Sequence, residues 1–173
     1  MTTKTCSLML FLMLSLQAFA QDFSISATAG YVHLNSIFKV DGEDYDLDFK
    51  NSGFFVGAQS EIDLTETIAI QPELLIAISG DYKTLYFGTL GAFEVAENFS
   101  LLAGPAINYL LEEVATNYSK LGVFGVFGAK YNITENISAQ AKYGIQLNNF
   151  YTGSADISSK VNYLLVGAAY KFL

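Results

Sequence analysis

The chain has 173 residues, with 17 acidic residues against 9 lysines, no arginine and a net charge of −8, and 51% of it is hydrophobic. The acidic balance disfavours nucleic-acid binding, because contact with phosphates needs a basic patch. The longest apolar run of the later chain, residues 121–129, is far shorter than the roughly 20 residues that a membrane-spanning helix needs. We therefore expect hydrophobicity that is dispersed along alternating positions.

The first predicted element is a secretory signal peptide over residues 1–20. Lys4 precedes an apolar run over residues 8–16, and an Ala-Phe-Ala cleavage pattern follows. A buried N-terminal helix is the alternative interpretation of the same run. Cleavage would leave a mature domain of residues 21–173. This domain has no cysteine, because Cys6 lies in the signal peptide, so we expect no disulfide and no thiolate metal site.

The remaining chain is predicted to form eight β-strands. Residues 137–149 give the clearest pattern, because apolar side chains occupy the odd positions from 137 to 147 and mostly polar ones the even positions. A period of two over this length indicates a strand with one apolar and one polar face. The predicted strands are Phe23–Leu34, Phe54–Asp63, Ile68–Ser79, Tyr82–Val95, Phe99–Glu112, Lys120–Ile133, Ile137–Asn149 and Val161–Leu173.

The connections between these strands alternate in length. Three of them are tight turns, near residues 64–67, 96–98 and 134–136. On the other side, a brief turn at 79–81 accompanies longer connections at Asn35–Ser52, Glu113–Asn117 and Tyr151–Lys160. Asn98 and Asn117 open N-x-S/T triplets, which we interpret as turn positions because asparagine tolerates a left-handed backbone. The pattern indicates a single domain of up-and-down hairpins.

An antiparallel sheet of this kind can form a sandwich, a soluble barrel or a membrane barrel. The apolar positions are numerous enough for the 9–11 residues of a tilted spanning strand. Tyr109, Tyr131 and Tyr170 lie near strand ends, where rings with a polar tip suit the lipid headgroup level. We therefore predict an all-β, eight-stranded antiparallel up-and-down transmembrane β-barrel. The charged residues predicted to pair inside its lumen are Glu61, Glu73, Glu94, Lys130, Lys142 and Lys171.

Pro72 and Pro105 lie on the apolar positions of their strands. Proline has no backbone N–H group and cannot donate to the hydrogen-bond ladder of a sheet. We therefore expect a bulge or a local disruption of strand pairing at each proline.

The chain ends in a motif of glycine, two residues, aromatic, one residue, aromatic: Gly167, Tyr170 and Phe172. This motif resembles the C-terminal insertion signal of bacterial outer-membrane barrels. Val166 replaces the polar residue that usually precedes the glycine, and Leu173 follows the final aromatic residue. Over the whole mature chain the sequence resembles small barrels of the OmpA/OmpX type and the porin-family outer-membrane β-barrel proteins of Bacteroidetes-like bacteria.

This resemblance implies a non-enzymatic protein of the bacterial outer membrane. We expect no open pore, because side chains fill the lumen of an eight-stranded barrel. Its expected partners are outer-membrane lipid, lipopolysaccharide and the barrel-insertion machinery, and we expect a monomer without cofactors. The long connections would support envelope integrity, adhesion or binding of an unknown external partner. Two alternatives stay open. One is a soluble, lipocalin-like barrel that binds a small apolar ligand, and the other is an acyl-chain enzyme that uses His33, the one histidine, as a base.

The segment between the first two predicted strands is strongly acidic. Alternate carboxylates could bind Ca²⁺, which takes several oxygen ligands, but their spacing does not match an EF-hand. We interpret the segment mainly as a solvated hairpin, with a cation site as the weaker interpretation. The candidate ligands are Asp41, Glu43, Asp44, Asp46 and Asp48.

Overall fold

The computed structural model describes residues 23–45 and 50–173, and these residues form nine β-strands. The described residues contain no helix that is long and apolar enough to cross a membrane. The strands are β1 (Phe23–Val40), β2 (Glu43–Tyr45), β3 (Lys50–Asp63), β4 (Ile68–Ser79), β5 (Tyr82–Ala96), β6 (Phe99–Leu110), β7 (Leu121–Asn132), β8 (Ile137–Gln146) and β9 (Ile157–Lys171).

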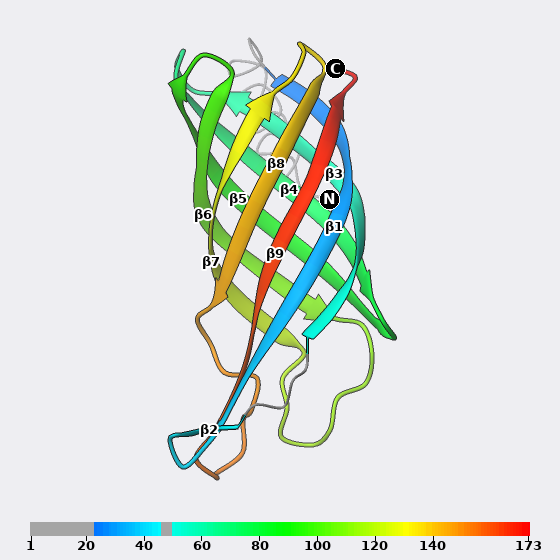
Figure 1. The fold of residues 1–173 in the computed structure, drawn as a ribbon, viewed down its shortest axis with the longest axis vertical. Helices are drawn as coiled ribbons and strands as arrows, with labels where there is room; N and C mark the ends of the chain where they lie inside the picture. The colour runs from blue at the N-terminus through cyan, green and yellow to red at the C-terminus, as the bar shows by residue number, and fades with distance from the viewer. Residues whose placement is uncertain (1–22, 46–49) are drawn as a thin grey trace, which may run out of the picture.

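Eight of these strands close into an antiparallel barrel. Each strand from β3 to β8 pairs with the next one along the chain, and β1 pairs with both β3 and β9 (Figure 1). This closure confirms the predicted eight-stranded up-and-down topology. The ninth strand, β2, is a three-residue extension that pairs only with the far end of β1.

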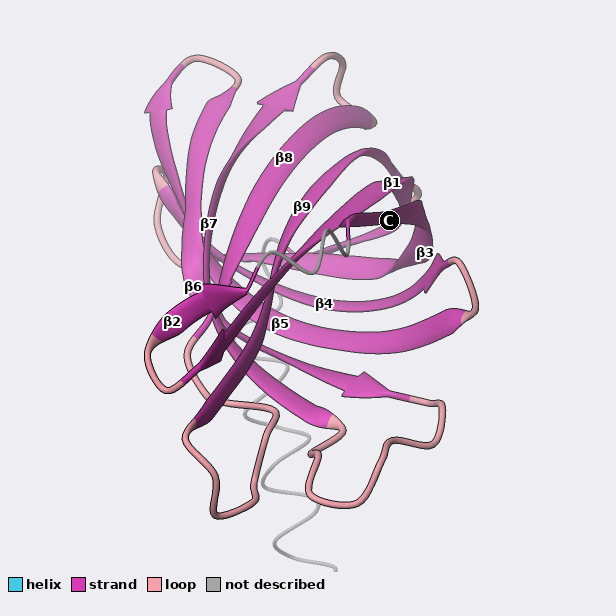
Figure 2. Cartoon of the chain, turned by 60° about the horizontal axis from the view of Figure 1, so that its bottom comes forward, coloured by secondary structure: helices cyan, strands magenta, loops and turns pink. Residues whose placement is uncertain are grey.

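The two ends of the barrel differ in their connections (Figures 1 and 2). One end, which we name the turn end, carries the short turns at residues 64–67, 97–98 and 133–136, together with the C-terminus. The other, the loop end, carries the longer segments after β1, β6 and β8. The predicted alternation of short and long connections is therefore confirmed.

The first predicted connection was too long. Residues 35–52 were expected to form a loop, but β1 continues to Val40 and β3 begins at Lys50. The cause is strand pairing: Ser36 lies opposite Val161, and the ladder continues until Val40 meets Ile157. These residues lie beyond the apolar belt, so their pattern does not alternate in hydrophobicity and alternation could not mark them.

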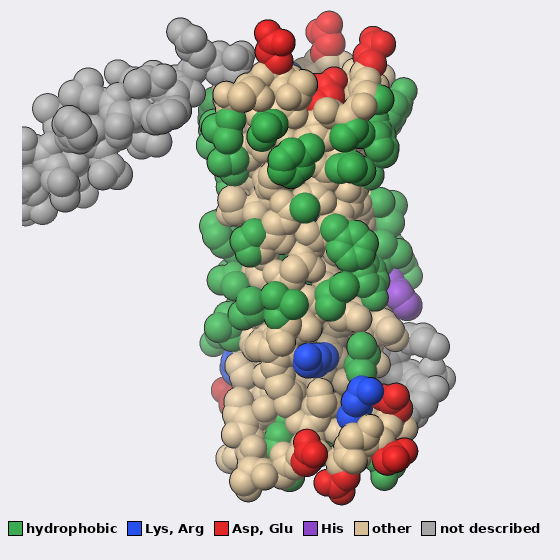
Figure 3. Space-filling model, turned by 90° about the vertical axis from the view of Figure 1, so that its left-hand side faces the viewer, with side chains coloured by type: hydrophobic (Ala, Val, Ile, Leu, Met, Phe, Trp, Pro, Cys, Tyr) green, Lys and Arg blue, Asp and Glu red, His purple; other side chains and the backbone are tan. Residues whose placement is uncertain are grey.

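The apolar positions of the strands face outward. Leu74, Ile76 and Ile78 of β4 are about half exposed, whereas Leu75 between them is fully buried. The outward side chains form a hydrophobic belt around the barrel, with acidic groups at the turn end and mixed charges at the loop end (Figure 3). This arrangement excludes the lipocalin-like alternative, which required the apolar set to face inward.

The two prolines interrupt strand pairing without shifting it. Between β3 and β4 the ladder is continuous to the pair Gln59–Glu73 and resumes at Ile62–Ile70 in the same register, so the gap falls at Pro72. Between β5 and β6 the corresponding gap falls at Pro105. The expected local disruption is confirmed, and the register shift of a bulge is absent at both prolines. The one register shift between these two strands lies instead near Glu94.

Candidate functional site

The centre of the barrel contains a buried ion pair between opposite walls. Lys142 of β8 points inward and donates a hydrogen bond to Glu73 Oε2 of β4. The two side chains are only 2% and 4% exposed, respectively. Burial of a charge is costly unless it is paired, so this pair holds two facing walls at a fixed relative position.

A second ion pair lies closer to the turn end. Lys130 of β7 binds Glu61 Oε2 of β3, and the exposed fractions of these side chains are 6% and 27%. The strands β3 and β7 are again opposite walls, and the two residues are 69 positions apart, as in the first pair. Each lysine–carboxylate pair therefore joins two opposite walls, and the second pair lies nearer the turn end than the first.

Glutamine side chains fill the space between these charges. Gln71 Nε2 donates to Gln140 Oε1 at 3.4 Å across the lumen. Gln59 Oε1, Gln71 Oε1 and Gln140 Nε2 are buried and have no protein hydrogen-bond partner. Buried polar atoms of this kind are the usual ligands of internal water molecules.

An aromatic layer lies on the loop side of the ion pairs. Tyr163 of β9 makes an edge contact with Tyr86 of β5, with ring centroids 5.2 Å apart, and a tilted contact with Phe124 of β7 at 4.9 Å. All three side chains are nearly fully buried. Rings from three walls therefore meet inside the lumen and block it with apolar side chains.

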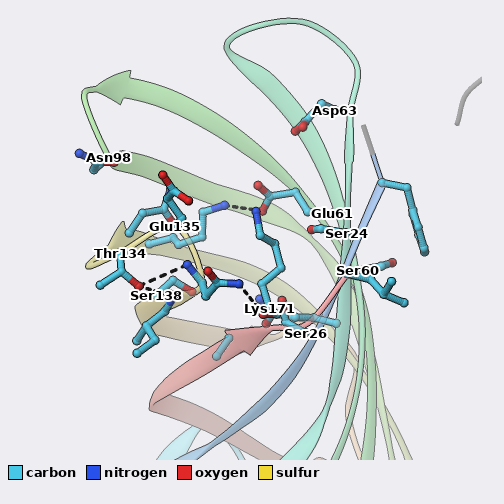
Figure 4. A pocket seen from close by; sticks show the side chains of 18 residues that line it. Ser24, Ser26, Ser60, Glu61, Asp63, Asn98, Thr134, Glu135, Ser138 and Lys171 are labelled. Carbon is cyan, nitrogen blue, oxygen red and sulfur yellow. Dashed lines mark hydrogen bonds and ion pairs between the residues drawn. The ribbon is translucent and has the colours of Figure 1, made fainter. Parts of the chain in front are cut away.

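A cavity of about 470 Å³ opens at the turn end (Figure 4). Its wall includes Glu61, Lys130 and Lys171, and Figure 4 shows the Lys171 side chain extending toward Glu61. Glu94, which was also predicted as a lumen charge, is exposed near the end of β5 and belongs to neither buried ion pair. The predicted lumen residues thus occupy two places, the buried interior and the turn-end mouth.

A second cavity of about 400 Å³ opens at the loop end. It is lined by inward side chains of β1, β3, β5, β6 and β9 and by the loop after β6. The aromatic layer and the ion pairs lie between the two cavities. The interior therefore consists of two separate mouths and a filled middle.

The C-terminal motif lies on the seam where β9 meets β1. Tyr170 and Phe172 are 55% and 53% exposed on the outer surface, whereas Lys171 faces inward. The N–H of Phe172 donates to the Ile25 carbonyl at 3.0 Å, which joins the last residues to the first strand.

Gly167 of the same motif has a structural role that the sequence alone did not indicate. It pairs with Gly30 of β1, and the Phe55 ring packs over both glycines. A Cβ atom added at Gly167 would lie 2.4 Å from the Ala29 carbonyl oxygen and 2.7 Å from Phe55 Cζ. One added at Gly30 would lie 2.2 Å from the Val166 carbonyl oxygen and 2.8 Å from Phe55 Cε1. Glycine is required here because the neighbouring backbone and the Phe55 ring leave no space for a Cβ atom.

His33 of β1 follows the inward-facing, fully buried Val32, so its side chain lies on the outer face of the strand. Its Nδ1 atom is 2.9 Å from Ser52 Oγ of β3, and the Tyr31 hydroxyl donates to the same Oγ at 2.6 Å. Sequence reasoning missed Ser52, although the antiparallel register places it directly opposite His33. The cluster gives His33 a hydrogen-bonded neighbour in a position that faces lipid.

The acidic segment forms the hairpin between β1 and β2. Asp41 and Gly42 have positive φ angles of 51° and 83° and make the turn, and Lys39 forms a 2.8 Å ion pair with Asp44. Within residues 23–45 and 50–173, no group of three or more histidine, cysteine or acidic side chains is placed to hold a metal ion. Of the candidate ligands, Asp46 and Asp48 lie outside the described residues.

Comparison with known proteins gives a consistent result. A family model described as "Outer membrane protein beta-barrel domain" matches residues 6–172. Ail, the attachment invasion locus protein of Yersinia pestis, is 21% identical, with a TM-score of 0.55 over 88% of this chain and 100% of Ail. Neisserial surface protein A is 15% identical, with a TM-score of 0.52 over 88% of this chain and all of that protein.

A de novo designed transmembrane β-barrel also has this fold, at 13% identity and a TM-score of 0.52 over 86% of this chain and 94% of the design. A search of curated protein sequences found no match. At these identities the solved structures share the fold of this chain.

Proposed function

The chain belongs to the outer membrane protein beta-barrel domain family, and from this premise we propose that it is a non-enzymatic outer-membrane anchor that displays its long loops outside the cell. The protein resides in the bacterial outer membrane, so its hydrophobic belt contacts lipid. In barrels of this kind the short turns face the periplasm and the longer loops face outward. The turn end is then periplasmic and the loop end is external.

The observation that carries this proposal is the filled interior. The Lys142–Glu73 pair and the Tyr86–Tyr163–Phe124 layer occupy the middle of the lumen. Eight-stranded barrels are just wide enough for side chains to fill. A protein with this interior acts through its outer surface rather than by passing solutes. Planar-bilayer recording tests this part, because steady large single-channel steps would contradict it.

The external loops would carry envelope integrity, adhesion or partner binding. Ail has been solved in complex with the heparin analogue sucrose octasulfate. The loop end of the present chain carries Asp41, Glu43 and Asp44 in its hairpin, and these side chains are exposed. A sulfated polyanion would be repelled by this hairpin, so we propose that a partner bound there is neutral or basic at its contact site.

Assembly and oligomeric state follow from the same proposal. Gly167, Tyr170 and Phe172 would serve as the signal that the insertion machinery binds, and the residues 1–20 as the export signal. Closure of β1 on β9 leaves no free barrel edge, which supports a monomer. The outer rim would meet lipopolysaccharide.

Replacement of single loops tests the display function. Residues 113–117 or 151–156 are exchanged for a short Gly-Ser linker, and a periplasmic turn, residues 64–67, is exchanged as the matched control. We expect the external replacements to reproduce the envelope or attachment defect of cells that lack the protein, while the folded barrel remains at normal abundance. Normal attachment and detergent resistance in every external variant would contradict the proposal.

A further inference from the structure

The external mouth of the barrel holds a cavity of about 400 Å³ that the anchor function does not use. We infer that this cavity binds a small uncharged molecule that has a ring or a short aliphatic chain and one hydroxyl or carbonyl group. Ligand sites commonly have volumes from about 300 to 1,000 Å³ and combine apolar walls with a few polar groups. The volume provides space for on the order of ten non-hydrogen atoms.

The walls of the cavity are rich in apolar and aromatic groups. Tyr82 and Tyr86 of β5, Tyr118 of the loop after β6, and Phe150 of the loop after β8 contribute rings, and Leu34 contributes an aliphatic side chain. Aromatic rings bury large apolar areas and contact other rings favourably. A ring or aliphatic group of a ligand would therefore be transferred from water to an apolar surface.

Polar groups at the wall are fixed in orientation. Asn108 Oδ1 accepts a hydrogen bond from the Gly122 N–H at 3.0 Å, and Asn51 Nδ2 donates to the Ser79 carbonyl at 3.1 Å. Together with Thr84, which lines the cavity and is buried, these groups suit a single ligand hydroxyl or carbonyl.

The charges around the cavity select against ions. Among the described residues that line it, Glu113 is the one charged residue, and it is exposed at the rim. A charged ligand would lose its hydration inside the cavity without gaining a counter-charge, which is unfavourable. The lining thus favours an uncharged ligand and disfavours an anion most strongly.

The cavity is closed below and partly preformed above. Tyr86 belongs both to the cavity wall and to the aromatic layer beneath it. Above it, Tyr118 bridges to Tyr151 of the neighbouring loop, with ring centroids 5.4 Å apart, and its N–H donates to the Ala115 carbonyl. A preformed site loses less entropy on binding. The site would hold its ligand at the cell surface and release it outward.

Titration with 4-propylphenol tests this inference on the full mature chain, refolded in zwitterionic lipid nanodiscs and followed by two-dimensional amide NMR. The expected result is a saturable shift confined to amides around the cavity, such as those of Thr84, Leu110 and Ala115. The anion 4-propylbenzoate should bind at least ten-fold more weakly. Shifts that rise without saturation and spread over belt residues would show partition into lipid and overturn the inference.

Two matched pairs of variants locate the site. Ser36→Trp fills the cavity, whereas Ile37→Trp places the same side chain on the opposite face of β1 at the same height. Ser159→Trp and Ser158→Trp repeat the comparison on β9. Each inward variant should weaken binding at least ten-fold and each outward variant should leave it unchanged. Equal binding by inward variants that retain the heat-modifiable folded band would overturn the inference.

Discussion

Lys142 and Glu73 form an ion pair between opposite walls of the barrel, where their side chains are 2% and 4% exposed. Removal of one partner leaves an uncompensated buried charge, which costs about 3–5 kcal/mol. We therefore expect Lys142→Met to lower the free energy of unfolding by this amount. The measurement is a urea titration of the refolded barrel in phospholipid vesicles, with the heat-modifiable band as the folded signal.

The double variant Glu73→Leu/Lys142→Met is the control for this prediction. Replacement of both charges by apolar groups is often neutral or stabilising, so the double variant should regain most of the lost stability. Equal stability of the wild type and Lys142→Met would show that the pair does not hold the walls together.

The hydrophobic belt predicts a depth-dependent cost for outward charges. Leu74 lies near the middle of β4 and Ile68 at its start, next to the turn end, and both side chains are exposed. Leu74→Arg should destabilise the barrel by about 2–4 kcal/mol, and Ile68→Arg by about 0–1 kcal/mol. Urea titration in vesicles measures both variants. Equal costs at the two positions would be inconsistent with a hydrophobic belt whose midplane lies near the middle of β4.

The residues of the C-terminal motif have two different expected roles. Gly167 is a packing residue, and Tyr170 and Phe172 belong to the predicted insertion signal. Gly167→Ala should destabilise the purified refolded barrel by about 1–3 kcal/mol, because the added methyl group meets the Ala29 carbonyl and the Phe55 ring. Tyr170→Ser/Phe172→Ser should instead lower the amount of barrel in the outer membrane of growing cells. Normal abundance of the aromatic double variant in the outer membrane would refute the predicted insertion signal.

The cluster of His33 and Ser52 gives a prediction about lipid chemistry. The anchor function predicts that His33→Ala and Ser52→Ala leave the acyl composition of lipid A unchanged, as determined by mass spectrometry of outer-membrane extracts. Cells that lack the protein and cells that overproduce it supply the two reference compositions. A composition that changes on overproduction and returns to normal with His33→Ala would establish the acyl-chain enzyme instead.

The sequence predicts the barrel better than its site. Alternation along residues 137–149 and the other strands was sufficient to predict the number of strands, their topology and which side chains face lipid. The reason is that a lipid-facing strand must be apolar at every second position. The strand extension from Ser36 to Val40 lies above the belt, where lipid imposes no pattern. The cavity at the loop end and the contact of His33 with Ser52 depend on how neighbouring strands are aligned. The hydrophobic pattern of a single strand carries no information about this alignment.

The lumen shows the same limit. Inward lysines and glutamates could be identified by position, but the partners of Lys130 and Lys142 depend on which strands become opposite walls after closure. Glu94 illustrates the difference, because it has the inward position of a lumen residue yet is exposed near the end of β5. Gly167 was interpreted only as part of a terminal motif, since the Phe55 ring that covers it comes from β3, which is far from Gly167 in the sequence.

Site-directed labelling in intact cells tests the external display of the loops most directly. Single cysteines are introduced by Ala115→Cys in the loop after β6 and by Glu97→Cys in a turn at the opposite end, and both positions are exposed. Cys6, the one cysteine of the sequence, lies in the predicted signal peptide. A membrane-impermeant maleimide should label Ala115→Cys in intact cells and Glu97→Cys only after lysis. Labelling of Glu97→Cys but not of Ala115→Cys in intact cells would contradict the account.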